Sequence, residues 1–213
     1  MSWLDFLSRK PAPAPVRPPV ELEIPLFPLA GVLFPGGALS LRVVEPRYVA
    51  MVTACLATAE PFGVCLIAHG GLPGAPALHP VGTLADLVQA GTEPSGELAV
   101  SARGGRRFRL LARTVAADGL PRARVALLDE PARHPVPAAQ QGLLPVLHRI
   151  ADDLGPLRMP EPHDFDDAAW VGYRLAEAMP VQALAKQKLL ELDDPVSRLE
   201  ILHTYLSQRK LVE

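Results

Sequence analysis

The chain has 213 residues, of which 49% are hydrophobic, so it can bury one large core or two small ones. Its 24 prolines argue against an all-helical fold. With 21 basic and 23 acidic side chains the net charge is −2, which excludes a general electrostatic attraction to nucleic acid or anionic membranes. No stretch is apolar and long enough to span a bilayer, and the first ten residues lack a secretory signal pattern. Cys55 and Cys65 lie in separate apolar runs, which predicts buried, reduced thiols and a cytoplasmic location.

Residues 1–20 precede the part of the sequence with regular patterns. Trp3, Leu4, Phe6 and Leu7 form a small apolar group that can dock on this molecule, on a sister subunit or on another partner, or can belong to a loose terminus. The next stretch, "PAPAPVRPPV", cannot be helical, and as polyproline II it spans roughly 30 Å. We therefore expect residues 1–20 to form a tail and a proline-rich spacer.

Residues 21–133 mostly show strand patterns. The apolar stretch "PLFPLAGVLFPGG" is too short and too interrupted for a membrane helix, and it predicts two short buried strands joined by "LAGV". "ALSLRV" alternates apolar and polar residues as a half-buried strand does. Further strands are predicted at "FGVCLIAH", at "VGTLADLVQA" and from Gly96 onward, with breaks at Gly104-Gly105 and at the hairpin signal Asp118-Gly119.

One helix interrupts these strands. In "EPRYVAMVTACLATAEP", Pro46 suits the first helical position, and apolar residues then recur at helical spacing until Glu60 and Pro61. The helix therefore lies inside a β-rich region.

Residues 134–213 have helical patterns throughout. A first apolar stripe ends at Gly155-Pro156, and its members are Leu143, Leu147, Ile150 and Leu154. Asp164 is predicted to cap a second helix that ends near Met179, and a third covers residues 181–192. A fourth begins at Asp194, with Pro195 in its first turn and a buried face of Val196, Leu199, Leu202 and Leu206. A bundle of helices is expected after the strands.

Taken in order, these segments resemble the amino-terminal substrate-recognition domain of Lon proteases. The similar stretches are "IPLFPLAGVLFPGGALSLRVVEPRYVAMV", "FGVCLI", "VGTLADL", "RGGRRFRLL" and "LAEAMPVQALAKQKLLELDDPVSRLEIL", and together they extend from about Glu21 to Leu206. The resemblance implies an α+β fold, in which a β barrel of the pseudouridine-synthase-and-archaeosine-transglycosylase (PUA-like) type with one inserted helix is followed by a helical bundle. The barrel is expected at residues 21–133 and the bundle at residues 134–213.

The resemblance covers the recognition module alone. An ATPase needs a glycine-rich phosphate loop with a lysine, and none of Lys10, Lys186, Lys188 and Lys210 lies in such a loop. Nothing in these residues corresponds to the Ser-Lys protease domain of Lon. The expected function is non-catalytic binding of exposed polypeptide segments or of a protein partner, without a cofactor.

The expected binding site is the apolar loop of Leu29, Val32, Leu33 and Phe34, together with Arg47. Large apolar patches that stay exposed usually mark binding sites, so some of these side chains should line a groove. Arg47 and Glu45 flank Pro46, where an ion pair and a carboxylate near a helix N-terminus explain them equally well.

Two alternatives remain. The basic stretch "RGGRRFRL" can contact RNA, although a strand with Phe108 and Leu110 inside and with Arg107 and Arg109 toward solvent or the acidic helices is the simpler interpretation. A small-molecule enzyme can use a cleft between barrel and helices. The acidic "PEPHDFDD" has metal-binding residue types, but helix capping explains Asp164 and its neighbours, so no metal is predicted.

Overall fold

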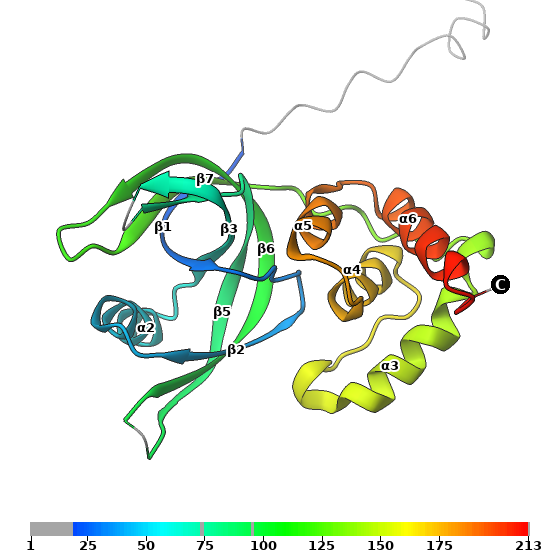
Figure 1. Cartoon of the computed structure of the whole chain (residues 1–213), viewed down its shortest axis with the longest axis horizontal. Coiled ribbons are helices and arrows are strands. Elements are labelled where there is room, and N and C mark those ends of the chain that lie inside the picture. Colours follow the sequence, from blue (N-terminus) through cyan, green and yellow to red (C-terminus); the bar gives the residue numbers. More distant parts are fainter. Residues whose placement is uncertain (1–18, 73–74, 95, 213) are drawn as a thin grey trace, which may run out of the picture.

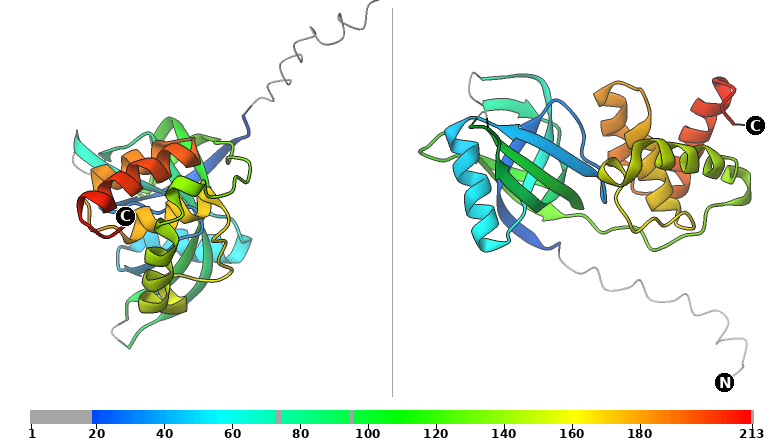
Figure 2. Two further views of the ribbon diagram at one scale, coloured as in Figure 1. Left: turned by 90° about the vertical axis from the view of Figure 1, so that its right-hand side faces the viewer. Right: turned by 90° about the horizontal axis from the view of Figure 1, so that it is seen from below.

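A computed structural model describes residues 19–72, 75–94 and 96–212 (Figure 1). The apolar group Trp3, Leu4, Phe6 and Leu7, and all of the spacer except its last two residues, lie outside the described residues. The strands form one half of the molecule and the helices α3 to α6 the other, as two further views also show (Figure 2). The expected α+β architecture of a barrel followed by helices is confirmed.

Seven strands of the described residues form a barrel that is only partly closed. They are β1 (Glu21–Leu29), β2 (Ala38–Val43), β3 (Phe62–Leu72), β4 (Ala75–Leu78), β5 (Val81–Thr92), β6 (Leu98–Val115) and β7 (Pro121–Leu127). Their order is β1-β7-β6-β5-β3-β4, and β2 pairs with β6 outside this path. The first half of β1 pairs antiparallel with β7, while its last four residues pair parallel with β3. This short parallel contact joins the two sides of the sheet.

The loop after β1 differs from the prediction. Instead of a second strand, residues 30–37 form a loop, and β1 pairs with β7 and β3 rather than with its successor β2. The loop is tied to β6, because the Gly36 N–H donates to the Gly104 carbonyl at 2.6 Å and the Gly104 N–H donates to the Gly37 carbonyl at 2.8 Å. A Cβ at position 104 would lie 2.1 Å from the Phe34 carbonyl oxygen, so only glycine allows this approach.

Gly104 in β6 therefore allows the close approach of the loop after β1 and does not interrupt the strand. The expected break at Gly104-Gly105 is wrong, since β6 is one strand from Leu98 to Val115. The hairpin signal Asp118-Gly119 is confirmed between β6 and β7: Gly119 has a φ of +80°, and the Asp118 carboxylate accepts from the Leu120 N–H at 3.0 Å.

The inserted helix is confirmed as α2 (Pro46–Thr58), which lies on the side of the barrel away from the other helices (Figures 1 and 2). Its buried residues Met51, Val52 and Cys55 pack against the barrel in one apolar cluster. The helix ends two residues before Glu60, because Ala59 adopts a left-handed conformation.

The remaining helices also follow the predicted pattern. They are a short 3-10 turn η1 (Ala138–Gln140), α3 (Leu143–Arg158), α4 (Ala168–Ala178), α5 (Ala183–Glu191) and α6 (Pro195–Gln208). The predicted stop at Gly155-Pro156 is a kink in α3, where Gly155 has a φ of +67°. Asp194 caps α6 as expected and accepts from the Ser197 N–H at 2.8 Å.

The predicted cap of α4 is wrong. Asp167 caps this helix and accepts from the Trp170 N–H at 3.0 Å, whereas Asp164 forms an ion pair with Arg133 at 2.6 Å. The sequence contains three aspartates within four positions, and the structure uses the last one as the cap while Asp164 pairs with Arg133 from another segment.

Both cysteines are free and buried, as predicted. Burial raises the pKa of the Cys55 thiol, and it raises the pKa of the Cys65 thiol to about 12. Among the helices of the described residues, none has the length and apolar character needed to cross a membrane.

Candidate functional site

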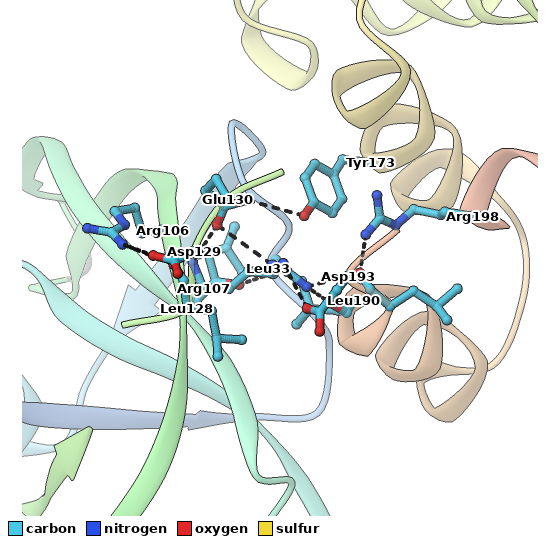
Figure 3. A network of polar contacts seen from close by, with 12 residues as sticks. Leu33, Arg106, Arg107, Leu128, Asp129, Glu130, Tyr173, Leu190, Asp193 and Arg198 are labelled. Carbon is cyan, nitrogen blue, oxygen red and sulfur yellow. Dashed lines mark hydrogen bonds and ion pairs between the residues drawn. The ribbon is translucent and has the colours of Figure 1, made fainter. Parts of the chain in front are cut away.

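The junction between barrel and helices is a network of polar contacts around two buried arginines, Arg107 and Arg198 (Figure 3). The fully buried Arg107, on β6, donates through Nη1 to the carbonyl oxygens of Leu190 and Leu192 at 2.9 and 3.0 Å. Its guanidinium also pairs with Asp193 at 3.2 Å and with Glu130 at 3.6 Å. Because the carbonyl groups at the end of α5 have no helical partners, Arg107 satisfies them and attaches α5 to the barrel.

A second buried arginine joins this network from α6. Arg198 donates through Nε to the Leu189 carbonyl at 2.9 Å, and its guanidinium lies 4.2 Å from the centre of the Tyr173 ring. Tyr173 donates to Glu130 at 3.4 Å, and burial raises the pKa of its hydroxyl, which stays protonated. Arg107 and Arg198 thus bond the carbonyl groups around the end of α5, while Glu130 pairs with Arg107 and accepts from Tyr173. These contacts hold the barrel and the helices together.

The predicted loop contributes to the same junction. Leu33 and Phe34 are buried, at 3% and 0% exposure, and they point into different cores. Phe34 packs among the helices, 6.0 Å from the Tyr173 ring, while Leu33 packs with α2 and the barrel, and its carbonyl accepts from the Thr83 hydroxyl at 2.7 Å. These two side chains are therefore not part of an exposed surface.

The other predicted residues lie nearer to solvent. Leu29 and Val32 are half-buried, so the structure separates them from Leu33 and Phe34. Arg47 pairs with Glu45 at 2.7 Å, donates to the Gly119 carbonyl at 2.9 Å and lies 4.9 Å from the centre of the Tyr48 ring. The structure therefore contains the ion pair between Glu45 and Arg47 that the sequence suggested.

Arg47 lines a hollow that we call the barrel groove, with a volume of about 270 Å³. Its walls come from β1, α2, β3 and the segment before α2, and include Phe27, Pro28, Val44, Tyr48 and Ile67. Val44 and Ile67 are exposed to 63% and 41%. Leu29 follows on the same face of β1 as Phe27, and both pack against the cluster that contains Tyr48.

A larger hollow, the helical groove, lies along α5 and α6 and has a volume of about 570 Å³. Its lining is almost entirely apolar, and includes Met179, Val181, Ala185, Leu189, Ile201 and Tyr205. Ile201 is 49% exposed, and Leu184 nearby on α5 is 53% exposed. This groove was not predicted from the sequence. Its signal was the presence of apolar residues on α5 and α6 outside the buried stripes.

One ion pair is part of the lining of the helical groove. Lys188 contacts Glu191 at 2.8 Å, with side-chain exposures of 69% and 20%. Burial raises the pKa of the Glu191 carboxyl, but hydrogen bonds from Lys188 and Gln187 outweigh this effect and hold the pKa below its ordinary value. Both charged residues of the lining are thus paired with each other, and the other lining residues are aliphatic or aromatic.

Neither the basic stretch "RGGRRFRL" nor the acidic stretch "PEPHDFDD" forms a separate site among the described residues. In "RGGRRFRL", Arg107 and Phe108 are buried, Arg106 donates to the Leu128 carbonyl, and Arg109 is exposed. The described residues contain no group of three or more His, Cys, Asp or Glu side chains that could hold a metal ion.

Comparisons with known proteins agree with this architecture. A crystal structure of a Lon N-terminal domain protein from Xanthomonas campestris is 36% identical, covers 86% of this chain and 98% of its own, and superposes with a TM-score of 0.72. The N-terminal domain of a Mycobacterium avium complex Lon protease has the same fold at 19% identity. It covers 87% of this chain and 98% of its own, with a TM-score of 0.63. The family model of the ATP-dependent protease La (LON) substrate-binding domain matches residues 23–208. The chain belongs to this family of Lon substrate-binding domains.

Proposed function

We propose that this chain recognises exposed apolar segments of other polypeptides, and that it holds them in the helical groove without ATPase or peptidase activity of its own. The family description supports binding of a substrate. The observation that carries the proposal is the helical groove itself, an open hollow of about 570 Å³ whose lining is mostly apolar and whose two charged residues are paired with each other. Grooves of this kind typically bind an amphipathic segment by its apolar face.

The expected affinity is modest. Each side chain of leucine or phenylalanine size that leaves water contributes roughly 1.5–3 kcal/mol, so two or three anchors contribute about 3–9 kcal/mol. The loss of freedom on association offsets several kcal/mol of this. Weak and reversible binding suits a module that recognises many sequences by their exposed apolar residues.

The barrel groove, with Arg47, Leu29 and Val32 at or near it, is proposed as a second, weaker contact surface for the same polypeptide. Filling it requires removal of water from the Arg47 guanidinium, which is already bonded to Glu45 and Gly119. RNA binding is less favoured, because the central arginine of the basic stretch, Arg107, is used inside the protein.

A pair of matched variants tests the proposal. Ile201→Glu places a charge in the helical groove at a position that is 49% exposed, so the fold should tolerate it. Leu157→Glu makes the same kind of change on α3, at a position that is 90% exposed and does not line the helical groove. The readout is fluorescence anisotropy of a labelled, permanently unfolded polypeptide.

We expect Ile201→Glu to weaken binding at least about tenfold, which corresponds to 1.4 kcal/mol, and Leu157→Glu to leave it unchanged. Both variants should keep the melting temperature of the parent protein. Equal affinities for the parent and Ile201→Glu would exclude the helical groove as the binding surface, and no binding by any variant would refute polypeptide recognition.

A further inference from the structure

We infer that the polypeptide segments held in the helical groove carry an acidic residue beside their apolar anchors, and that its carboxylate pairs with Arg209 at the end of α6. This inference rests on the proposed function, because it names the class of segment that the same groove accepts. Three features of the molecule support it: the position of Arg209 next to the lining, the ordered end of α6, and the distribution of charges around the groove.

Arg209 lies directly beside the lining of the helical groove. It follows Tyr205 by four positions, so the two side chains lie on the same face of the helix. The Arg209 guanidinium lies 3.9 Å from the centre of the Tyr205 ring, and Tyr205 lines the groove. Contact with the ring holds the guanidinium in place, while the exposure of Arg209 leaves its charge available. An apolar side chain that contacts Tyr205 therefore binds next to a positive charge.

Hydrogen bonds fix the backbone where α6 ends. The N–H groups of Lys210 and Leu211 donate to the carbonyl oxygens of Ser207 and Leu206 at 2.9 and 3.0 Å. Lys210 has a φ of +57°, a left-handed conformation in which glycine is the usual residue at a helix end. A lysine at this position costs conformational free energy, and it adds a second exposed cation next to Arg209. The end of α6 thus presents two positive charges on an ordered backbone.

No carboxylate of the described residues neutralises this end of the groove. Neither Arg209 nor Lys210 forms an ion pair within that part of the chain. Glu200, the acidic residue of α6, precedes Arg209 by nine positions, which is about 13 Å along the helix axis. The helix dipole also favours cations at a helix C-terminus, but it leaves the solvent side of the guanidinium unpaired.

The other charged side chains around the groove already have partners within the protein. Those of α5 and of the connection to α6, together with the buried arginine of α6, are Lys186, Lys188, Glu191, Asp193, Asp194 and Arg198. Figure 1 shows that α6 runs away from the barrel, so its last turn lies at the far end of the helical half. The groove is therefore balanced in charge where α5 meets α6 and positive at its Tyr205 end.

This distribution of charge selects among apolar segments. A segment with a basic neighbour would place like charges side by side at Arg209, whereas an aspartate or glutamate within about four positions of the anchor at Tyr205 can reach the guanidinium. Because the ring already holds the guanidinium, little further side-chain freedom is lost when the pair forms. An exposed ion pair of this kind changes affinity by about threefold.

Two labelled peptides test the inference. They share the same leucine and phenylalanine anchors and differ only in the residues that flank these anchors at both ends, which are glutamate in one peptide and lysine in the other. Anisotropy titrations measure both peptides with the full chain and with two charge reversals, Arg209→Glu and Arg109→Glu. Arg109 is exposed on β6 in the barrel half and does not line the helical groove, so Arg109→Glu makes the same change of net charge elsewhere.

We expect the parent to bind the glutamate peptide at least about threefold more tightly than the lysine peptide. Arg209→Glu should reverse this order, and Arg109→Glu should keep it. If Arg209→Glu lowers the melting temperature, Arg209→Gln removes the charge more gently and should abolish the difference between the peptides. Equal affinities of the parent for both peptides overturn the inference, and so does an order that the Arg209 variants leave unchanged or that Arg109→Glu also reverses.

Ile201→Glu separates this inference from the proposed function. If the parent binds both peptides equally and Ile201→Glu weakens both, the groove binds apolar segments regardless of their charge, so the proposed function stands and the inference fails. If the parent binds neither peptide, or if Ile201→Glu weakens neither, the helical groove is not the binding surface and both fail.

Discussion

The helical groove and the barrel groove both have apolar walls, but they differ in how many charged residues line them. The barrel groove is lined by Arg42, Glu45 and Arg47, and Arg47 is held there by Glu45, the Gly119 carbonyl and the Tyr48 ring. The lining of the larger helical groove includes one ion pair, Lys188–Glu191, and is otherwise apolar. Removing water from a charge costs free energy unless new bonds replace the lost ones. The helical groove can therefore accept an apolar segment at the lower cost.

The two grooves also differ in what supports them. The barrel groove is built on paired strands and on α2, within one half of the molecule. The helical groove has α5 as one wall, and α5 is short and is attached to the barrel through Arg107. The more favourable binding surface thus depends on the contacts between the two halves, which the following predictions test in order of expected size.

The largest effect is expected at Phe34. Phe34→Ala should lower the free energy of unfolding by about 3–5 kcal/mol, because the ring is fully buried among the helices and its removal leaves a cavity at the junction. The half-buried neighbour Val32 provides the control, since Val32→Ala should cost much less. Chemical denaturation measures both. A Phe34→Ala protein of parental stability with weakened client binding would return the loop to the role of an exposed site.

The next effect concerns the attachment of α5. Arg107→Ala should lower the free energy of unfolding by roughly 3 kcal/mol, at the lower end of the range for broken buried pairs, because Asp193 is exposed and can regain water. Arg109→Ala on the same strand should change stability by less than about 0.5 kcal/mol, since Arg109 is exposed. Thermal and urea unfolding compare the two.

This pair also bears on client binding. If α5 depends on Arg107, the helical groove should lose client affinity in Arg107→Ala before the barrel unfolds. Parental stability of Arg107→Ala would show that the junction does not need its central charge. The RNA alternative is best tested with Arg106 and Arg109 alone, because a change at Arg107 confounds binding with folding.

A pH effect is expected in the barrel half. Burial raises the pKa of Cys65 from 9.0 to about 12, so above pH 9 the unfolded chain loses this proton while the folded protein keeps it. The folded state then binds more protons, and stability falls as pH rises, by up to about 1.4 kcal/mol per unit for this group. Below pH 9 the thiol contributes no slope.

Cys65→Ala isolates this contribution. The variant should show a shallower fall of unfolding free energy between pH 9 and 11 than the parent, and the native parent should resist thiol reagents at pH 8. Identical slopes in parent and variant, measured by denaturation at each pH, would show that Cys65 is not shielded as its burial indicates.

The smallest effect is expected in the barrel groove. Arg47→Ala should change the affinity for an unfolded polypeptide by less than about threefold, since the groove is the weaker surface and its guanidinium is already bonded within the protein. The affinity of the protein for the unfolded polypeptide should also be nearly independent of salt. Binding of RNA through three phosphate contacts would instead lose roughly eighteenfold in affinity over a fourfold increase in salt. A larger loss in Arg47→Ala than in Ile201→Glu would reverse the order of the two grooves.

Local chemistry in the sequence determined several elements directly. Pro46 and Asp194 begin α2 and α6, and Asp118-Gly119 turns the chain between β6 and β7, because capping and turn geometry involve only residues a few positions apart. The order of strands followed by helices, and hence the family, could also be predicted from the sequence.

Tertiary structure decided the surfaces. The sequence predicts that some side chains of the apolar loop stay exposed without showing which ones, and the approach of the loop to Gly104 buries Leu33 and Phe34. The sequence leaves Arg107 facing either solvent or the acidic helices, and the tertiary structure buries it against the carbonyl groups at the end of α5. The helical groove exists only because residues of α5, of α6 and of the segment between α4 and α5 are brought together, which no single helix pattern contains. Burial and grooves depend on which distant segments come together, whereas a local sequence pattern indicates only the conformation that each segment prefers by itself.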